Sequence, residues 1–268
     1  MMQFNSPPLL EVKDLCISYR KGGISSSIKG PVCAVKGVSF SVKPGETYAI
    51  VGESGSGKTS IAMSVIGFLR PLTGTIFFMN KNIWELDRSG LRRLRSNIQP
   101  VFQNSGASLN PRMSAGKIIS EAFHAIVDEH EKEKALIDLL RSVGLDREIL
   151  RRFPHELSGG QKQRLNIARA LALKPRLIIL DEPLSSQDLS TRAQLIHLLS
   201  SFKKAYLLSY ILISHNLSLV RLISDRIAIM KQGVFIEEGA TEQIINNPSN
   251  NYTKVLIEAS NIKNVKTG

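Results

Sequence analysis

The residues of this chain with the clearest chemical potential begin with a glycine-rich run of eight. The run reads Gly52-Glu53-Ser54-Gly55-Ser56-Gly57-Lys58-Thr59 and fits G-x-x-x-x-G-K-[ST] in full. Glycines at these places let backbone N–H groups curl around phosphate oxygens, and the N-terminus of a following helix adds positive potential. Lys58 can reach the β- and γ-phosphates of a nucleotide, and the Thr59 hydroxyl can bind Mg²⁺. The run therefore predicts a site for a nucleoside triphosphate, in which we include the next residue, Ser60.

Two carboxylates provide a second group. Asp181 and Glu182 directly follow the apolar run Leu177–Leu180, which is typical of a buried strand. Asp181 can hold Mg²⁺ through its waters, and Glu182 can orient and polarise a water that attacks the γ-phosphate. Phosphoryl transfer depends on positioning and charge compensation, so few groups suffice. The pair predicts hydrolysis of the bound nucleotide.

A third group opens a helix at Leu157-Ser158-Gly159-Gly160-Gln161. A loop of small residues that leads into a helix N-terminus is a second place for an anion. On shape alone, a serine-capped helix start fits equally well. Within PHELSGGQKQRLNIARAL, however, the run resembles the signature of the ABC ATPases.

Other elements of that family follow in the expected order, and the resemblance covers the chain from about Leu9 onward. Gln103 resembles the Q-loop glutamine, His215 the switch histidine, and Tyr19 the aromatic residue that stacks on adenine. The resemblance implies that Lys58, Gln103, Glu182 and His215 are catalytic. It implies that Thr59, Gln103 and Asp181 bind Mg²⁺. It implies that ATP contacts Tyr19, Gly52, Glu53, Ser54, Gly55, Ser56, Gly57, Lys58, Thr59, Ser60, Gln103 and Asp181.

The resemblance also implies a head-to-tail dimer with ATP held between two subunits. Ser158, Gly160, Gln161 and Asp188 would then serve the ATP of the partner subunit. Two positions depart from the family pattern: Gln187 replaces the leucine of S-A-L-D, and Asn216 replaces the aspartate after the switch histidine. Because Asp188 and His215 are retained, neither departure predicts an inactive site.

Two further segments narrow the resemblance. Val101–Asn104 with Ser108–Met113 resembles the VFQ-x-x-x-x-SLNPR-M stretch of the dipeptide, oligopeptide and nickel importer ATPases. Asn247–Leu256 resembles their N-P-x-H-P-Y-T-K-x-L segment, with Asn250-Asn251 in place of His-Pro. The chain is most similar to the second, F-like ATPase of such importers. This similarity implies a different ATPase as partner, two permeases, a solute-binding protein that acts indirectly, no nucleic acid, and a peripheral location on the cytoplasmic face of the inner plasma membrane.

Composition sets the wider limits. The 268 residues are 43% hydrophobic and 22% charged, which is enough chain for a large core. With only Cys16 and Cys33, neither a disulfide framework nor an iron–sulfur or zinc cluster is expected. The formal charge of +12 favours anionic partners. Two alternatives to a transport ATPase stay open. One is an ATPase that acts on nucleic acid, which the charge favours, and the other is a regulatory ATP-dependent dimer.

Strands and helices must position these groups. Hydrophobic periodicity and turn residues predict strands around Leu10–Ile17, Val38–Val42, Tyr48–Val51, Gly74–Met79, Leu177–Leu180 and Ile211–Ile213, and a hairpin at Gln232-Gly233. Helices are expected at Ser60–Leu69, ended by Arg70-Pro71, at Gln161–Leu173, and through Leu195 to Phe202. The uncharged stretch Ala205–Val220 is too short to span a membrane and predicts a buried strand followed by a loop.

The alternation of strands and helices predicts the fold class. We expect an α/β P-loop NTPase of the ABC ATPase type, with a mostly parallel core sheet, an antiparallel N-terminal β part and a helical insertion. The nucleotide-binding domain is expected at residues 9–258, with the helical insertion at about 105–152, and a tail at 259–268.

Overall fold

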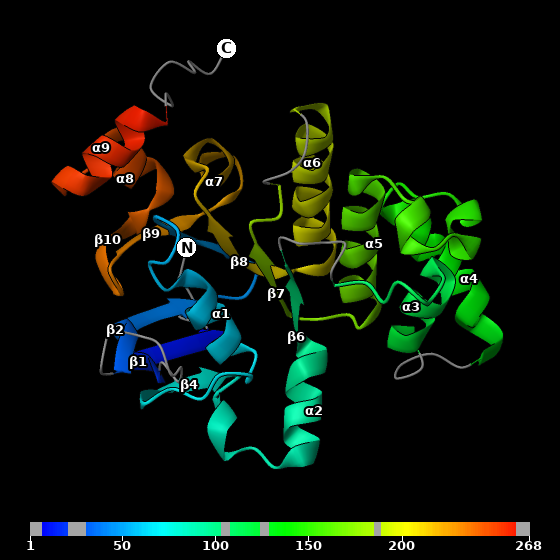
Figure 1. Ribbon diagram of the computed structural model, residues 1–268, viewed down its shortest axis with the longest axis horizontal. Helices are drawn as coiled ribbons and strands as arrows, with labels where there is room; N and C mark the ends of the chain where they lie inside the picture. Colours follow the sequence, from blue (N-terminus) through cyan, green and yellow to red (C-terminus); the bar gives the residue numbers. More distant parts are fainter. Residues whose placement is uncertain (1–6, 21–30, 103–107, 124–128, 185–188, 261–268) are drawn as a thin grey trace, which may run out of the picture. The chain divides into compact units, whose positions relative to one another are not determined.

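The computed structural model describes residues 7–20, 31–102, 108–123, 129–184 and 189–260. Figure 1 shows the order of the elements along the chain. The chain divides into two compact units, residues 1–95 with 209–268 and residues 96–208. Each unit is described by itself.

The first unit contains an antiparallel sheet with the strand order β2-β1-β4-β5. The strands are β1 (Leu10–Arg20), β2 (Pro31–Val42), β4 (Thr73–Phe78) and β5 (Lys81–Asn82). On β1, Leu10, Val12, Leu15 and Ile17 are all buried. In a regular strand, side chains three positions apart, such as Val12 and Leu15, would point to opposite faces. A register shift lies between Val12 and Leu15, and Asp14 has a left-handed φ of 49°. This bulge returns the second apolar pair to the buried face.

The same unit also contains the strands that carry the phosphate loop. The strand β3 (Thr47–Val51) pairs in parallel with β8 (Ser209–Ser214) and with β9 (Arg226–Lys231), and β10 (Val234–Ala240) pairs antiparallel with β9. Every residue of β3 and β8 is buried, as expected for parallel strands that are covered on both faces. The helices of this unit include α1 (Lys58–Val65), α7 (Leu217–Ile223), α8 (Thr241–Asn246) and α9 (Asn251–Ala259).

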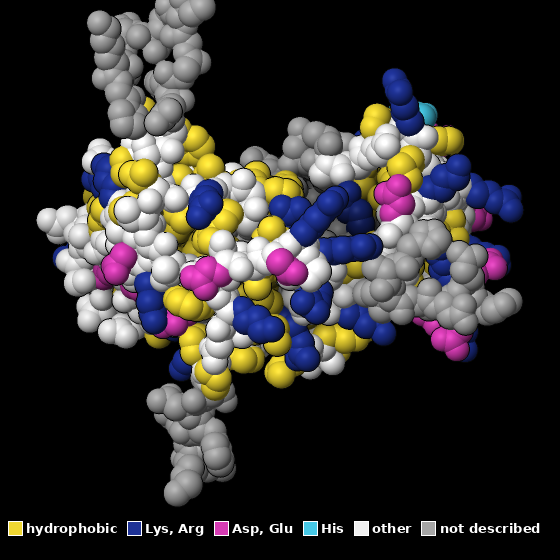
Figure 2. All heavy atoms as spheres, turned by 90° about the horizontal axis from the view of Figure 1, so that it is seen from below, with side chains coloured by type: hydrophobic (Ala, Val, Ile, Leu, Met, Phe, Trp, Pro, Cys, Tyr) yellow, Lys and Arg dark blue, Asp and Glu magenta, His cyan; other side chains and the backbone are white. Residues whose placement is uncertain are grey.

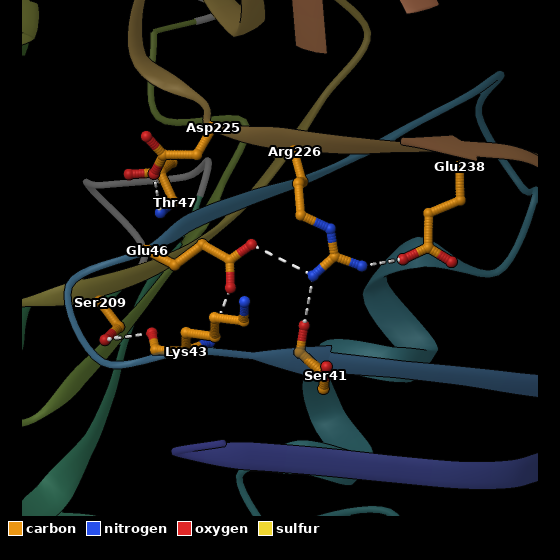
Figure 3. A network of polar contacts seen from close by, with 8 residues as sticks. All are labelled: Ser41, Lys43, Glu46, Thr47, Ser209, Asp225, Arg226 and Glu238. Carbon is orange, nitrogen blue, oxygen red and sulfur yellow. Dashed lines mark hydrogen bonds and ion pairs between the residues drawn. The ribbon is translucent and has the colours of Figure 1, made fainter. Parts of the chain in front are cut away.

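A network of charged and polar groups connects the beginning of β3 to its neighbours (Figure 3). The Arg226 guanidinium forms ion pairs with Glu46, at 3.2 Å, and with Glu238. The second oxygen of the Glu46 carboxylate accepts a hydrogen bond from the Lys43 N–H. The Thr47 N–H donates to the Asp225 carboxylate at 2.7 Å. These contacts fix the end of β3 opposite to the phosphate loop.

Two expected boundaries are wrong. The first helix ends at Val65 and not near Arg70-Pro71. Gly67 has a φ of 73°, its N–H donates to the Ser64 carbonyl, and the Phe68 N–H donates to the Met63 carbonyl. These two bonds form a Schellman motif, so the glycine ends the helix before the proline is reached.

The second wrong boundary follows β8. The sequence predicts a loop there, but α7 begins at Leu217, and the Asn216 side chain accepts a hydrogen bond from the Leu219 N–H at 3.1 Å. Asparagine and aspartate cap helices equally well. The departure from the family's aspartate at this position therefore preserves the helix start.

The second unit holds two parallel strands, β6 (Ile98–Val101) and β7 (Leu177–Asp181). It also holds most of the helices around the signature segment, including those within the expected insertion. They are α3 (Ala115–Phe123), α4 (Glu129–Ser142), α5 (Gly159–Ala172), α6 (Leu189–Tyr206) and the short 3₁₀ turns Arg147–Arg151 and Pro154–Glu156. Within the described ranges, no helix is both long and apolar enough to cross a membrane.

The helix α2 (Arg88–Asn97) carries part of the basic excess. Its four arginines, Arg88, Arg92, Arg93 and Arg95, are exposed. Figure 2 shows Lys and Arg side chains gathered on the face seen from below, the side on which α2 lies in Figure 1. Arg95 also lies over the exposed Phe68 ring, 4.8 Å from its centroid.

Candidate nucleotide-binding site

The phosphate loop lies between the buried strand β3 and the helix α1, as the sequence predicts. Gly57 caps the helix with a φ of 111°, a conformation that favours glycine. A Cβ at Gly57 would lie 2.2 Å from the Ala34 carbonyl oxygen, and one at Gly52 would lie 2.1 Å from the Met230 carbonyl oxygen. The loop thus needs glycine at both positions, because the backbones of β2 and β9 approach it closely.

Lys58 is the first residue of α1, and its side chain turns back along the loop. Its ammonium donates to the carbonyl oxygens of Gly52, at 2.8 Å, and of Glu53, at 2.7 Å. The residue is only 7% exposed. A positive charge held against a loop of backbone N–H groups favours an anion there, and phosphate is the anion that this geometry suits.

The β9–β10 turn supports the loop from another part of the sequence. The Gly233 N–H donates to the Ser56 carbonyl at 3.0 Å, and the Gly233 carbonyl accepts from the Lys36 N–H at 2.8 Å. Gln232 and Gly233 both have positive φ, at 49° and 89°. The sequence predicts this turn from Gln-Gly but gives no sign that it contacts the phosphate loop, because no local pattern encodes such a contact.

Tyr19 and Ser60 lie together in the same unit. The Tyr19 hydroxyl donates to the Ser60 hydroxyl at 3.0 Å, and Tyr19 is 41% exposed. An aromatic side chain with this exposure, anchored beside the first turn of α1, is available to stack on a flat ligand. The contact places Tyr19 beside α1, and its stacking on adenine stays a prediction.

The pairing of β8 with β3 places His215 near the phosphate loop. Its preceding residue, Ser214, is the register partner of Val51, the last residue of β3. The phosphate loop and His215 therefore follow the carboxyl ends of two adjacent parallel strands, which is where α/β folds bind their ligands. His215 is exposed.

The two predicted carboxylates lie in the second unit. Asp181 ends β7 and is 8% exposed, while Glu182 is half-buried and has a left-handed φ of 50°. Such a φ in a residue other than glycine costs on the order of 1 kcal/mol and is found preferentially at functional sites. Other residues of the chain, such as Asp14 and Gln232, share this conformation, so it is compatible with a role of Glu182 but does not identify one.

The signature segment is the start of α5. The Ser158 hydroxyl accepts from the Gln161 N–H at 3.2 Å, and the Gln161 side chain accepts from the Ser158 N–H at 2.9 Å. This capping box orders the helix N-terminus while Ser158 stays exposed. Beside it lies a cavity of about 270 Å³, whose lining includes Ser158, Gly160, Gln161, Arg164 and Gln194. A helix N-terminus of this kind can bind an anionic group of another molecule.

The structure thus assembles the predicted residues in two sets. The first unit brings together the phosphate loop, Tyr19, Ser60 and His215, and the second holds Asp181, Glu182 and the signature segment. Gln103, Gln187 and Asp188 lie outside the described residues. The side-chain oxygens of Thr59 and Asp181 are of the type that Mg²⁺ prefers, and Asp181 is buried.

Known proteins resemble this chain over most of its length. Residues 35–185 match the family model described as ABC transporter. The chain is 43% identical over 258 residues to the oligopeptide transport ATP-binding protein AmiF of Streptococcus pneumoniae, a match that covers 95% of this chain and 82% of that protein. It is 41% identical over 256 residues to the dipeptide transport ATP-binding protein DppF of Lactococcus lactis, covering 94% of this chain and 80% of that protein.

Solved structures agree with these relatives. The cbiO1 protein of Clostridium perfringens, part of the ABC transporter complex cbiONQ, aligns with a TM-score of 0.77 at 29% identity, covering 90% of this chain and 91% of that one. The cassette MJ0796, solved as a dimer bound to ADP and phosphate, aligns with a TM-score of 0.77 at 26% identity, covering 87% of this chain and 98% of that one.

Proposed function

Because this chain belongs to the ABC transporter family, among the ATP-binding proteins of oligopeptide and dipeptide transport, we propose that it binds and hydrolyses ATP to drive a peptide importer. It has the ABC ATPase fold that the sequence predicts. The observation that carries the proposal is the phosphate loop, in which buried Lys58 is held against the backbone by the Gly52 and Glu53 carbonyls.

The chemistry follows from the two sets of residues. Lys58 compensates charge on the β- and γ-phosphates, and Thr59 with Asp181 would hold Mg²⁺, which would supply further charge compensation. Gln103 is proposed as a further ligand of the metal. Glu182 orients and polarises the attacking water, with His215 beside the γ-phosphate. Tyr19 stacks on the adenine ring.

The site is proposed to be completed by a second subunit. Donors at the α5 N-terminus, from Ser158, Gly160 and Gln161, would face the ATP of the partner subunit, together with Asp188. The exposed capping box supports this role, because its serine is ordered yet accessible. The cassette MJ0796, a similar protein solved as a dimer bound to ADP and phosphate, supports dimerisation.

The remaining partners are integral to this proposal. Two permease subunits would span the plasma membrane, and the ATPase would bind to them at the cytoplasmic face of that membrane. A solute-binding protein would deliver the cargo. The relatives reported above are named for oligopeptides and dipeptides, so peptides are the proposed cargo rather than nickel.

The segment after Gln103 is the proposed contact with the permease. Its described part is fixed to α5: the Ser108 hydroxyl donates to the Asn166 side chain at 3.1 Å, and the Arg169 guanidinium donates to the Ser108 carbonyl at 2.8 Å. Movement of this segment would therefore be transmitted to the helix that bears the signature residues.

Reconstitution tests this function. The chain should co-purify with two permeases and a second ATPase. Membrane vesicles that contain all four subunits should take up labelled peptide only when ATP is present on the side of the membrane that the ATPases face. Cysteines introduced between Asn104 and Ser108 should cross-link to a permease. Capture of ATPase chains alone, or hydrolysis stimulated by DNA instead of by the permeases, would contradict the proposal and favour a nucleic-acid ATPase.

A further inference from the structure

The signature helix α5 is bound to two neighbouring elements through the side chain of Arg164. This residue lies one turn after Gln161, so its side chain leaves α5 on the same side as the end of the signature segment. The guanidinium donates to the Val143 carbonyl at 2.7 Å and to the Gln194 side-chain oxygen at 2.6 Å. Because Val143 directly follows α4 and Gln194 lies on α6, one planar group connects three helices.

The contact with Val143 completes the end of α4. Gly144 has a φ of 70°, and its N–H and that of the next residue each donate to a carbonyl of α4 at 2.9 Å, which forms a Schellman motif. The Val143 carbonyl, at the end of the helix, accepts from Arg164. A positive charge at a helix C-terminus is favoured by the helix dipole, so this contact also stabilises the end of α4.

The guanidinium also packs closely over the glycine that ends α4. A Cβ at Gly144 would lie 2.6 Å from Nη1 of Arg164, closer than a real side chain can approach this atom. Arg164 is half-buried, whereas Gln194 is exposed. The position of the guanidinium is therefore set by a glycine, a helix end and one exposed amide, all within the second unit.

The bridge made by Arg164 lies at the cavity beside the signature segment. Arg164 and Gln194 both line this cavity, together with Ser158, Gly160 and Gln161 at the start of α5. The groups proposed to serve the partner's ATP thus surround the same cavity as the bridge. Small misplacements of groups that position a substrate cost affinity and rate, so the direction of the α5 N-terminus relative to α4 and α6 matters for that role.

We propose that Arg164 is a positioning residue for the nucleotide of the partner subunit. By bridging Val143 and Gln194, it holds the N-terminus of α5 in the direction in which the signature donors reach that nucleotide. Arg164 itself does not touch the nucleotide, and the phosphate loop of its own chain, in the first unit, does not depend on it. This inference rests on the proposed role of the signature segment toward the partner's ATP.

The first test breaks the bridge at its exposed end. Because Gln194 is exposed, Gln194→Ala should leave thermal unfolding of the chain unchanged. ATP-dependent dimerisation with the partner ATPase, measured on the Glu182→Gln background, should weaken by about three- to tenfold, which is part of the worth of one hydrogen bond to a charged group. Gln194→Glu keeps an acceptor whose charge the guanidinium compensates, so this variant should retain dimerisation.

The second test displaces the guanidinium from the end of α4. Gly144→Ala would push Nη1 of Arg164 away from Val143, because the new methyl group takes its place. The matched control is Gly37→Ala, which introduces a methyl group at nearly the same φ, 69°, with nothing within 4 Å. Both variants should lose similar stability through backbone strain, and only Gly144→Ala should weaken dimerisation.

Variants of Arg164 itself show whether the effect passes through the bridge. Arg164→Met keeps the stem and removes every donor, so the double variant Arg164→Met/Gln194→Ala should dimerise no more weakly than Arg164→Met alone. ATP binding by the isolated chain should be unchanged in these variants and lost in Lys58→Ala, which removes the ammonium from the phosphate loop. Native dimerisation in Gln194→Ala, a further loss in the double variant, or loss of ATP binding in Arg164→Met would overturn the proposal.

Ser158→Asp separates this inference from the function on which it rests, because its charge should repel the γ-phosphate of the partner's ATP. If Ser158→Asp prevents dimerisation and Gln194→Ala leaves it unchanged, the signature segment serves the partner and the positioning role of Arg164 is wrong. If Ser158→Asp dimerises at native affinity, the signature segment lies away from the partner's nucleotide, and both proposals are wrong.

Discussion

At the scale of single residues, Gly52 and Gly57 of the phosphate loop are constrained by the close approach of neighbouring strands. Gly57→Ala would place a methyl group 2.2 Å from the Ala34 carbonyl oxygen at a φ of 111°. We expect the loop to shift and ATP affinity to fall by at least about tenfold, since the N–H groups would no longer converge on one phosphate. Equilibrium binding of ATP measures the effect.

The control for this substitution is Gly37→Ala. Gly37 also has positive φ, at 69°, but a Cβ there would meet nothing within 4 Å. It should cost about 1–2 kcal/mol of unfolding free energy through backbone strain alone and leave ATP affinity unchanged. If Gly57→Ala behaves like Gly37→Ala, the close approach of β2 has no part in shaping the site.

The prediction about the hydrolysis step concerns Glu182. Glu182→Gln keeps the size of the side chain and the left-handed backbone at φ 50° but removes the charge that polarises water. Turnover should fall by roughly a hundredfold or more, while ATP binding persists and the ATP-bound dimer accumulates. Single-turnover hydrolysis and ATP retention, measured beside Lys58→Ala, test this. Native turnover in Glu182→Gln would show that another group activates the water.

At the scale of elements, the start of α5 combines a structural role and a proposed functional role in one serine, and two substitutions separate them. Ser158→Ala removes the acceptor for the Gln161 N–H and should cost about 1 kcal/mol of unfolding free energy. Ser158→Asp retains a capping oxygen, so stability should be near that of the native chain. Its added charge should repel the γ-phosphate of the partner's ATP and prevent ATP-dependent dimerisation.

Denaturant unfolding and sedimentation in ATP, both on the Glu182→Gln background, measure these two effects. Dimerisation of Ser158→Asp at native affinity would place the signature segment away from the partner's nucleotide. Loss of dimerisation in Ser158→Asp with full stability would assign the segment to the interface.

The elements that the sequence predicts best are those whose signal is local. The apolar runs that became β3, β7 and β8 and the serine-capped α5 agree with their predictions to within one or two residues. The end of α1 was wrong because Gly67 and Pro71 are competing stop signals, and the αL glycine comes first in the chain. The helix α7 was missed because its seven residues, Leu217–Ile223, are too few for a clear helical period.

The parts of the candidate site that the sequence could predict are likewise those with a local signal. The phosphate loop, the acidic pair and the signature segment could be predicted because each is a contiguous run with its own chemistry. The support of Ser56 by Gly233 could not, because it joins residues more than 170 positions apart through tertiary structure. The net charge of +12 likewise indicates anionic partners but does not distinguish ATP from nucleic acid.

At the scale of the whole molecule, the proposed site is incomplete in one chain, because the signature donors are proposed to serve the ATP of a second subunit. The F-type relatives and the altered D-loop residue Gln187 favour a different ATPase as that subunit. The chain alone should bind ATP but hydrolyse it slowly. Its cognate partner should raise turnover by at least about tenfold, since donors supplied to a phosphoryl transition state are worth this much or more.

Titration of the chain with the partner ATPase, at fixed total protein, tests this directly. Activity should peak at an equimolar ratio, and the peak should be lost when the partner carries the equivalent of Ser158→Asp. If the chain alone hydrolyses ATP rapidly and cooperatively, it would instead be a homodimeric ATPase. In that case Gln187 would be compatible with a symmetric interface, and the partner subunit would be a second copy of this chain.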